Sequence, residues 1–422
     1  MEQIVQATQD ELLPGLNFKP PSTASYILEK KQATIQPQSG GTFSPAGVRV
    51  IRFHLSDPNW LDPTSVRVSL NVKETGNVNP LIPVAPPNCL FNRLRVLAGS
   101  QVIEDISHYN RTYMMYHSLL PTDRRCDDAI EGWGLDSAAV SMTSMDSFEP
   151  VPGGDFRRVS LHLLSGLLSQ PKLLPLKVCP LTIELHIGDA QDAFSSAVGA
   201  STTWLIENAE LKCNIITLDS LMDQQFHDHL RAGRSLYVPI STWTTTMQAV
   251  TAPSNYRVDL ARGYSALKTV IATQSKAADN QTISFYHKAA GGDPTNGTAS
   301  SDDDIEYQIQ IGSAMYPTLP VRGFAESFYR LREALGIHVG ESSVNITPSS
   351  FKSNRFMMAI DVEKANVGPG AAAAFTGANT RQGSLISVLV KGPTNDAERC
   401  YITCHYDAVM TIRGEGGVEL AD

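Results

Sequence analysis

Apolar and polar residues alternate strictly along several segments of this 422-residue chain. The clearest of these segments are residues 66–73, 181–187, 305–311 and 400–412. Successive side chains of a β-strand point to opposite faces of its sheet, so this pattern predicts sheets with one buried face. Such sheets pack in antiparallel pairs, whereas the strands of a parallel core read as continuous apolar runs. The sequence therefore predicts an all-β protein built from sandwiches.

One short helix is predicted between two β-rich halves. From Leu221 to Leu230, apolar residues recur at helical spacing. We expect Ser220 to cap the first turn of this helix and Gly233 to end its last turn. The chain is long enough for two sandwiches of about 200 residues each, one on either side of the helix.

These patterns divide the chain into five units. The predicted units are an extended N-terminal arm (1–24), a first sandwich (25–219), the linker helix (220–233), a second sandwich (234–415) and a C-terminal tail (416–422). Short helices are also expected within loops at residues 107–120 and 323–336, where the apolar spacing is again helical. Residues 123–154 read as irregular, because Ser, Asp and Gly are frequent there.

The balance of charge argues against direct binding to nucleic acid. The formal net charge is −9, whereas sequence-independent binding to nucleic acid needs a basic face. The N-terminal arm contains the acidic residues Glu2, Asp10 and Glu11 but only one basic residue, Lys19. We therefore expect no direct, sequence-specific contact with nucleic acid.

The apolar segments and the cysteines favour a chain without a membrane helix or disulfides. No segment reaches the about 18 consecutive apolar residues that a membrane helix needs, and we expect no signal peptide. The six cysteines are scattered, with no C-x-x-C pair. Cys400 and Cys404 share one face of a predicted strand at a spacing too wide for a disulfide. We expect them to be buried free thiols.

Two groups of residues invite interpretation as metal sites. His227 and His229 lie in the linker helix, with Asp223 one turn before His227, and an i,i+4 pair of this kind could begin a zinc site. The two histidines point about 200° apart on a helix, so a solvated linker helix is the favoured interpretation. Residues 302–304 are three aspartates, whose oxygens suit calcium, although a solvated acidic turn is again favoured. We expect no metal and no cofactor.

Motifs of catalysis are also missing from the sequence. There is no G-x-S-x-G nucleophile elbow, and the glycine-rich segment at 292–298 lacks the lysine of a phosphate loop. Tyr109, Tyr113 and Tyr116 could stack on bases, but on an amphipathic helix without nearby basic residues they are expected to anchor a core. We therefore expect a protein that is not an enzyme and has no catalytic residues.

Four longer segments carry a resemblance to a known family. They are SYILEKKQATIQPQSGGTFSPAGVRVIRFHLSDPNWLDP (25–63), RLRVLAGSQVIEDISHYNRTYMMYHSLLP (93–121), LHLLSGLLSQPKLLPLKVCPLTIELHI (161–187) and IENAELKCNIITLDSLMDQQFHDHL (206–230). Together they resemble the double jelly-roll major capsid proteins of the adenovirus-hexon lineage, and most closely its polinton, adintovirus and polinton-like virus branch. The second half of the chain resembles this family more loosely.

The resemblance implies both a fold and a function. The fold is two tandem eight-stranded antiparallel jelly rolls, with short helices in loops and a linker helix between the rolls. The function is that of a viral major capsid protein, whose homotrimer forms a pseudo-hexagonal capsomer that tiles an icosahedral shell. This chain is short for the lineage, so tall outward towers are not expected.

The resemblance also implies the partners. They are the other copies in the homotrimer, neighbouring capsomers, a single jelly-roll penton protein, and minor or cement capsid proteins. The acidic arm (1–24) would lie on the inner side of the shell and bridge to neighbours. The protein would be located in the virion, after assembly in the cytoplasm or nucleus of the host, and members of the lineage differ in whether they enclose an inner membrane.

For the trimer interface, we expect the irregular apolar material outside the sandwiches to make the contacts. This material comprises Leu81 to Leu90, the predicted helix at 107–120 and the loop near Trp133. An obligate interface of this kind buries more than about 2,000 Å².

Two other functions fit a pair of sandwiches. A carbohydrate-binding or carbohydrate-cleaving protein would carry paired carboxylates in a groove and remain a monomer. A minor structural protein of a virion would be present in fewer copies per particle and need not form hexagonal trimers.

Overall fold

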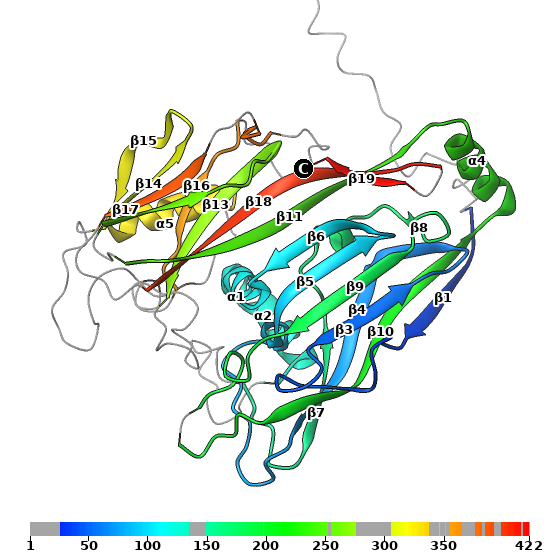
Figure 1. The fold of residues 1–422 in the computed structure, drawn as a ribbon, viewed down its shortest axis with the longest axis horizontal. Helices are drawn as coiled ribbons and strands as arrows, with labels where there is room; N and C mark the ends of the chain where they lie inside the picture. The colour runs from blue at the N-terminus through cyan, green and yellow to red at the C-terminus, as the bar shows by residue number, and fades with distance from the viewer. Residues whose placement is uncertain are drawn as a thin grey trace, which may run out of the picture.

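The computed structural model places most of the chain in two β-rich halves that lie side by side (Figure 1). The residues that it describes are 26–134, 148–196, 198–251, 255–275, 305–336, 346, 351, 355–364, 376–381, 385–391, 398–414 and 417–421. The three aspartates at 302–304 and the N-terminal arm therefore lie outside the described residues.

The first half consists of two antiparallel sheets. One sheet has the strand order β1-β10-β4-β7, formed by Ile27–Ile35, Trp204–Leu218, Trp60–Glu74 and Phe156–Leu161, with the short strands β2 (Thr42–Phe43) and β8 (Leu174–Pro175) paired to it. The other sheet has the order β3-β9-β5-β6, formed by Val50–Leu55, Leu181–Ile187, Phe91–Ala98 and Gln101–Ser107.

The second half repeats this arrangement. Its larger sheet has the order β11-β18-β13-β16, formed by Leu236–Ala249, Arg399–Ile412, Ala266–Ser275 and Met358–Asp361. Its smaller sheet has the order β12-β17-β14-β15, formed by Asn255–Leu260, Ile386–Lys391, Glu306–Ile311 and Ala314–Arg322. When the eight main strands of each half are numbered in chain order, both halves read 1-8-3-6 and 2-7-4-5. The predicted pair of eight-stranded antiparallel jelly rolls is thus confirmed.

The alternating segments form the strands as predicted, and their apolar faces form the core. In β3, Ile51, Phe53 and Leu55 are buried, whereas Arg52 and His54 between them are exposed. The predicted inward face of β18, from Cys400 to Ile412, is buried along its whole length. Each roll therefore encloses an apolar layer between its two sheets.

Helices occupy the loops and the join between the rolls. They are α1 (Tyr109–Leu119), α2 (Thr122–Glu131), α3 (Gly166–Ser169), α4 (Ser220–Arg231) and α5 (Gly323–Ala334), with a 3₁₀ turn η3 at Pro87–Leu90. The sequence predicts α1, α4 and α5, but α2 falls in the segment that reads as irregular. Its sequence, TDRRCDDAIE, is mostly charged, so the apolar spacing that marks the other helices is weak there.

Two local predictions are wrong. Asp219 precedes the first turn of α4 without a side-chain hydrogen bond to it, and Ser220 is the first helical residue instead of the cap. The predicted tail (416–422) contributes a strand, β19 (Val418–Ala421), which pairs with β18 and lengthens the larger sheet. Pro63 lies within β4, where it is tolerated because the pairing of β4 with β10 is interrupted next to it.

Candidate functional site: the interface between the two rolls

The outer face of β18 is buried as well as its inner face. Tyr401 and Thr403 point away from the core of the second roll, and both are buried. The first roll covers them, since its elements α1, α3 and β6 contact the neighbouring strand β11 (Figure 1). We call this contact region the inter-roll interface. Because it fixes how the two rolls lie relative to each other, it is the candidate functional site of the chain.

Three threonine hydroxyls connect the rolls across this interface. Thr112 Oγ1 of α1 and Thr245 Oγ1 of β11 lie 2.5 Å apart, and Thr245 Oγ1 lies 2.9 Å from Thr403 Oγ1 of β18. Each hydroxyl can donate one hydrogen bond and accept another, so the buried groups satisfy one another. Next to them, the Arg111 guanidinium lies over the Tyr401 ring, 4.8 Å from its centroid.

Aromatic rings extend the interface along β11. The Trp243 ring lies between Tyr116 of α1, at a centroid distance of 6.5 Å, and His405 of β18, at 4.2 Å. The Ser241 hydroxyl is hydrogen-bonded to His405 Nε2 at 2.9 Å. Burial, together with nearby Lys268, lowers the pKa of His405 to about 4, and Asp407 opposes this effect. His405 is therefore neutral at physiological pH, which suits a ring stacked in a buried contact.

A buried carboxylate holds the loop that begins α3. Glu104 of β6 lies opposite Val96 on the core face of its sheet. The Ser165 hydroxyl donates a hydrogen bond to it, and the backbone N–H groups of Gly166 and Leu167 donate at 2.8 Å and 3.3 Å. Burial raises the pKa of Glu104, and the hydrogen bond from Ser165 opposes that effect. The carboxylate thus fixes the loop at the edge of the first roll.

Gly166 brings the two rolls into backbone contact. A Cβ atom added at Gly166 would lie 2.2 Å from the carbonyl oxygen of Ser241 on β11. It would also lie 3.1 Å from Glu104 Oε1 on the other side. Only glycine fits between these two groups, so the loop held by Glu104 packs closely against the backbone of the second roll.

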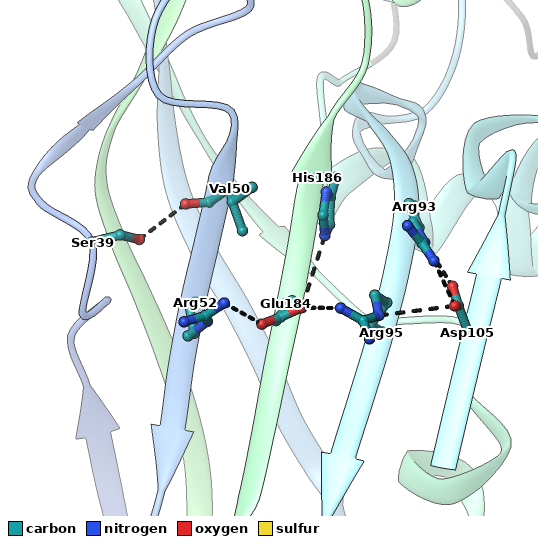
Figure 2. A network of polar contacts seen from close by, with 8 residues as sticks. All are labelled: Ser39, Val50, Arg52, Arg93, Arg95, Asp105, Glu184 and His186. Atoms are coloured by element: carbon teal, nitrogen blue, oxygen red, sulfur yellow. Dashed lines mark hydrogen bonds and ion pairs between the residues drawn. The ribbon is translucent and has the colours of Figure 1, made fainter. Parts of the chain in front are cut away.

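A ladder of alternating charges crosses the outer face of the β3-β9-β5-β6 sheet (Figure 2). Glu184 of β9 lies directly between Arg52 of β3 and Arg95 of β5. Its oxygens are 2.6 Å from Arg52 Nη2 and 3.0 Å from Arg95 Nη1. On β6, Asp105 accepts two hydrogen bonds from Arg93, at 2.7 Å and 2.6 Å. Opposite charges on neighbouring strands stabilise this register.

Of the residues considered for zinc, Asp223 joins the linker helix to the first roll, whereas His227 bonds within the helix. Trp60 Nε1 of β4 donates a hydrogen bond to Asp223 Oδ1 at 2.9 Å, and the Trp60 ring packs on Phe226. His227 Nδ1 lies 2.8 Å from the backbone oxygen of Asp223. In the part of the chain that the structure describes, no group of three or more His, Cys, Asp or Glu side chains could hold a metal ion.

The other residues singled out in the sequence lie in cores. Tyr109 and Tyr113 are buried, as predicted for core anchors, and the Tyr109 hydroxyl accepts a hydrogen bond from the Leu164 N–H at 2.8 Å. Cys400 and Cys404 are buried free thiols, and burial raises the pKa of both to about 12. None of the helices described is long and apolar enough to cross a membrane.

The prediction that the apolar residues of 81–90, of α1 and of the loop near Trp133 form the trimer interface is wrong. Leu81, Leu90 and Trp133 are buried within one chain, as is most of α1. Trp133 Nε1 donates to the Ala85 oxygen at 2.9 Å, so these loops pack on one another. Side chains already buried in the monomer cannot supply an apolar surface between monomers. The helix α1 instead forms part of the inter-roll interface.

Glu104 and Gly166 were not singled out from the sequence. Glu104 is a polar residue on the core face of a strand, and such a break in the apolar pattern is the one signal that points to it. The register of β5 and β6 shifts beside it, between Val96 and Leu97, so the face on which Glu104 lies could not be counted from the sequence.

The fold of this chain is similar to that of solved structures, although its sequence matches no known family. No model of a protein family matches the sequence, and no curated protein is significantly similar to it. Among solved structures, PBCV-1 VP54, fitted into a reconstruction of the virophage Sputnik, matches with a TM-score of 0.62 and 14% identity over 96% of this chain and 99% of that chain. The chain shares the fold of this structure.

Two further capsid structures support this result. The cryo-EM structure of the Sputnik virophage matches with a TM-score of 0.59 and 10% identity, over 98% of this chain and 92% of that chain. The mavirus major capsid protein matches with a TM-score of 0.50 and 9% identity, over 98% and 95%. In all three cases the match covers nearly the whole of both chains, so the likeness extends over both jelly rolls.

Proposed function

We propose that the chain is a viral major capsid protein that acts by assembly and is not an enzyme. Three copies form a pseudo-hexagonal capsomer, because each copy supplies two of its six similar corners. The observation that carries this proposal is the pair of jelly rolls with the same strand order, locked together at the inter-roll interface. A capsomer of this shape requires two equivalent rolls in a fixed relation, which independent domains on a loose linker would not provide.

The fold comparisons support the same function. Each of the three matching structures is a viral capsid or capsid protein, and each is matched over almost its full length. The partners that follow are two further copies of the chain, neighbouring capsomers, a single jelly-roll penton protein, and minor or cement capsid proteins. A protein with this function would be located in the virion.

The mass of the purified protein tests this proposal. Light scattering at micromolar concentration should give about three times the chain mass of 45.8 kDa, and electron micrographs should show particles with hexagonal outlines. A mass that stays near 45.8 kDa would contradict the proposal and favour the carbohydrate-binding alternative. Trimers that occur in few copies in purified particles would instead indicate a minor structural protein of the virion.

A further inference from the structure

An apolar groove of about 660 Å³ lies where the linker helix meets both rolls. Its wall is formed by the start of β1, by β4, by α4 and by the start of β11, which meet at one end of the molecule (Figure 1). Among the residues that line the groove are Tyr26, Ile27, Trp60, Met222, Phe226 and Tyr237. Lys172 is the one charged residue among those that line the groove.

Large apolar side chains are exposed around this groove. Tyr26 is 58% exposed, Leu221 is 64% exposed and Tyr237 is 61% exposed. The strand β1 is exposed over residues 27–32 on both of its faces. A strand in a sandwich normally buries one face, so this end of β1 lacks a covering layer. Exposed apolar surface of this extent marks a binding site.

The segment before β1 has the chemistry to cover the groove. Residues 1–25 precede Tyr26, which lies on the groove wall. Between Leu12 and Phe18 the sequence reads LLPGLNF, with four large apolar residues in a short stretch. Asp10 and Glu11 come directly before it, so their carboxylates can pair with Lys172 when the apolar residues fill the groove.

The tether between this segment and the groove has a suitable length. Residues 19–25 can span up to about 25 Å when extended. The helix α4, along which Met222 and Phe226 line the groove, has 12 residues and is therefore about 18 Å long. A short tether gives the segment an effective concentration on the order of 1 mM. That concentration favours binding within one chain over binding from another chain.

We propose that residues 12–18 bind in this groove of their own chain. The apolar side chains cover Trp60, Met222 and Tyr237, and Pro20 with Pro21 limits the conformations of the tether. Docking of this kind leaves only residues 1–11 of the arm to bridge to neighbouring proteins. It does not depend on whether the chain forms capsomers.

A peptide of residues 8–21 tests the proposal by calorimetric titration into two full-length proteins. One protein is the wild type, and the other carries Leu13→Ser, Leu16→Ser and Phe18→Ser, which weaken its own segment. The peptide should bind the triple variant with a Kd on the order of 10 µM and the wild type at least about tenfold more weakly, because the wild-type segment competes. Equal binding to both proteins, or binding to neither, would overturn the proposal.

Two further variants identify the site and the chain that supplies the segment. Adding Met222→Ser to the triple variant should abolish peptide binding, whereas Leu319→Ser, at a residue of β15 that is 77% exposed, should not change it. In a Leu16→Cys and Met222→Cys double variant that also carries Cys126→Ser, oxidation should give a cross-linked monomer. Cross-links between chains, or no cross-link, would show that the groove is not filled by its own segment.

Discussion

Two glutamates of the first roll are buried to a similar extent but are held in opposite ways. Glu104 of β6 is 1% exposed, and its hydrogen bonds come from the Ser165 hydroxyl and from backbone N–H groups. Glu184 of β9 is 4% exposed, and it lies between the guanidinium groups of Arg52 and Arg95. One carboxylate is bound by uncharged donors at the inter-roll interface, and the other by cations on an outer sheet face.

This difference separates the two tasks that a two-roll protein must perform. The donors to Glu104 belong to a loop that touches β11, so the carboxylate positions one roll against the other. The partners of Glu184 are long side chains at the surface, where water can replace the carboxylate after its removal. Removing the Glu104 carboxylate should therefore disturb the placement of one roll against the other. Removing the Glu184 carboxylate should weaken only the sheet to which it belongs.

The largest effect is expected for Glu104→Ala. The substitution leaves the Gly166 and Leu167 N–H groups and the Ser165 hydroxyl without an acceptor in a buried site. The free energy of unfolding should fall by about 4 kcal/mol, as measured by urea titration. Glu104→Gln keeps an acceptor oxygen and should cost about 1 kcal/mol. Equal losses for the two variants would show that the carboxylate oxygens do not hold the loop.

The next effect is expected for Gly166→Ala. The new methyl group would overlap the Ser241 carbonyl of β11, so the rolls must move apart or the loop must leave Glu104. We expect a loss of about 3 kcal/mol in the free energy of unfolding, with a lower fraction of trimer in light scattering. Gly41→Ala is the matched control, because a Cβ atom at Gly41 meets no atom within 4 Å. If both variants behave alike, close contact at Gly166 is not what sets the interface.

Acid should weaken the interface through His405. Its pKa in the folded chain is lowered to about 4, mainly by burial, with Lys268 of β13 lowering it and Asp407 of β18 opposing. In the unfolded chain the pKa returns to about 6.5, so the unfolded chain binds the proton first as the pH falls. Between about pH 7 and about pH 5, this one group should remove about 2 kcal/mol from the free energy of unfolding.

The variant His405→Phe isolates this contribution. Phenylalanine keeps the stacking on Trp243 but does not titrate. The wild type should lose about 2 kcal/mol more than the variant over the same pH range. Glu104 changes stability with the opposite sign, since burial raises its pKa, but it is present in both proteins and cancels. Parallel pH profiles for the two proteins would exclude His405 as the acid-sensitive group.

The strands of both rolls could be predicted from the sequence wherever one face meets the core. Alternation located β4, β9, β14 and β18, because the inner and outer faces of these strands differ in polarity. β15 was missed because Pro317 and Pro320 argue against a strand, and it tolerates them as an edge strand that pairs only with β14 among the described strands. The family resemblance implied two eight-stranded jelly rolls, but alternation carries no information on pairing, so the order of strands within the sheets came only from the structure.

The inter-roll interface could not be predicted in the same way. Its contacts join residues far apart in the sequence, such as Gly166 with Ser241 and Thr112 with Thr245. Gly166 has no side chain, and Ser241, Thr112 and Thr245 are small polar residues of a kind that is ordinary at a protein surface. In the folded chain Thr112 and Thr245 are buried where the two rolls meet, and the sequence of either roll alone gives no sign of this contact. The long buried outer face of β18 is a consequence of docking that composition does not reveal.

The smallest effect is expected for Glu184→Gln. The substitution keeps the shape of the side chain but removes the charge between Arg52 and Arg95. The free energy of unfolding should fall by about 1 kcal/mol, and by less at high salt, because solvent and ions screen what remains of the ladder. Asp189→Asn is the matched control: Asp189 pairs with Arg49 at 3.1 Å, but its side chain is 74% exposed, so the loss should stay below about 0.5 kcal/mol. If Glu184→Gln lowered the free energy of unfolding as much as Glu104→Ala, the charged sheet face would also hold the two rolls in their relative placement, as the inter-roll interface does.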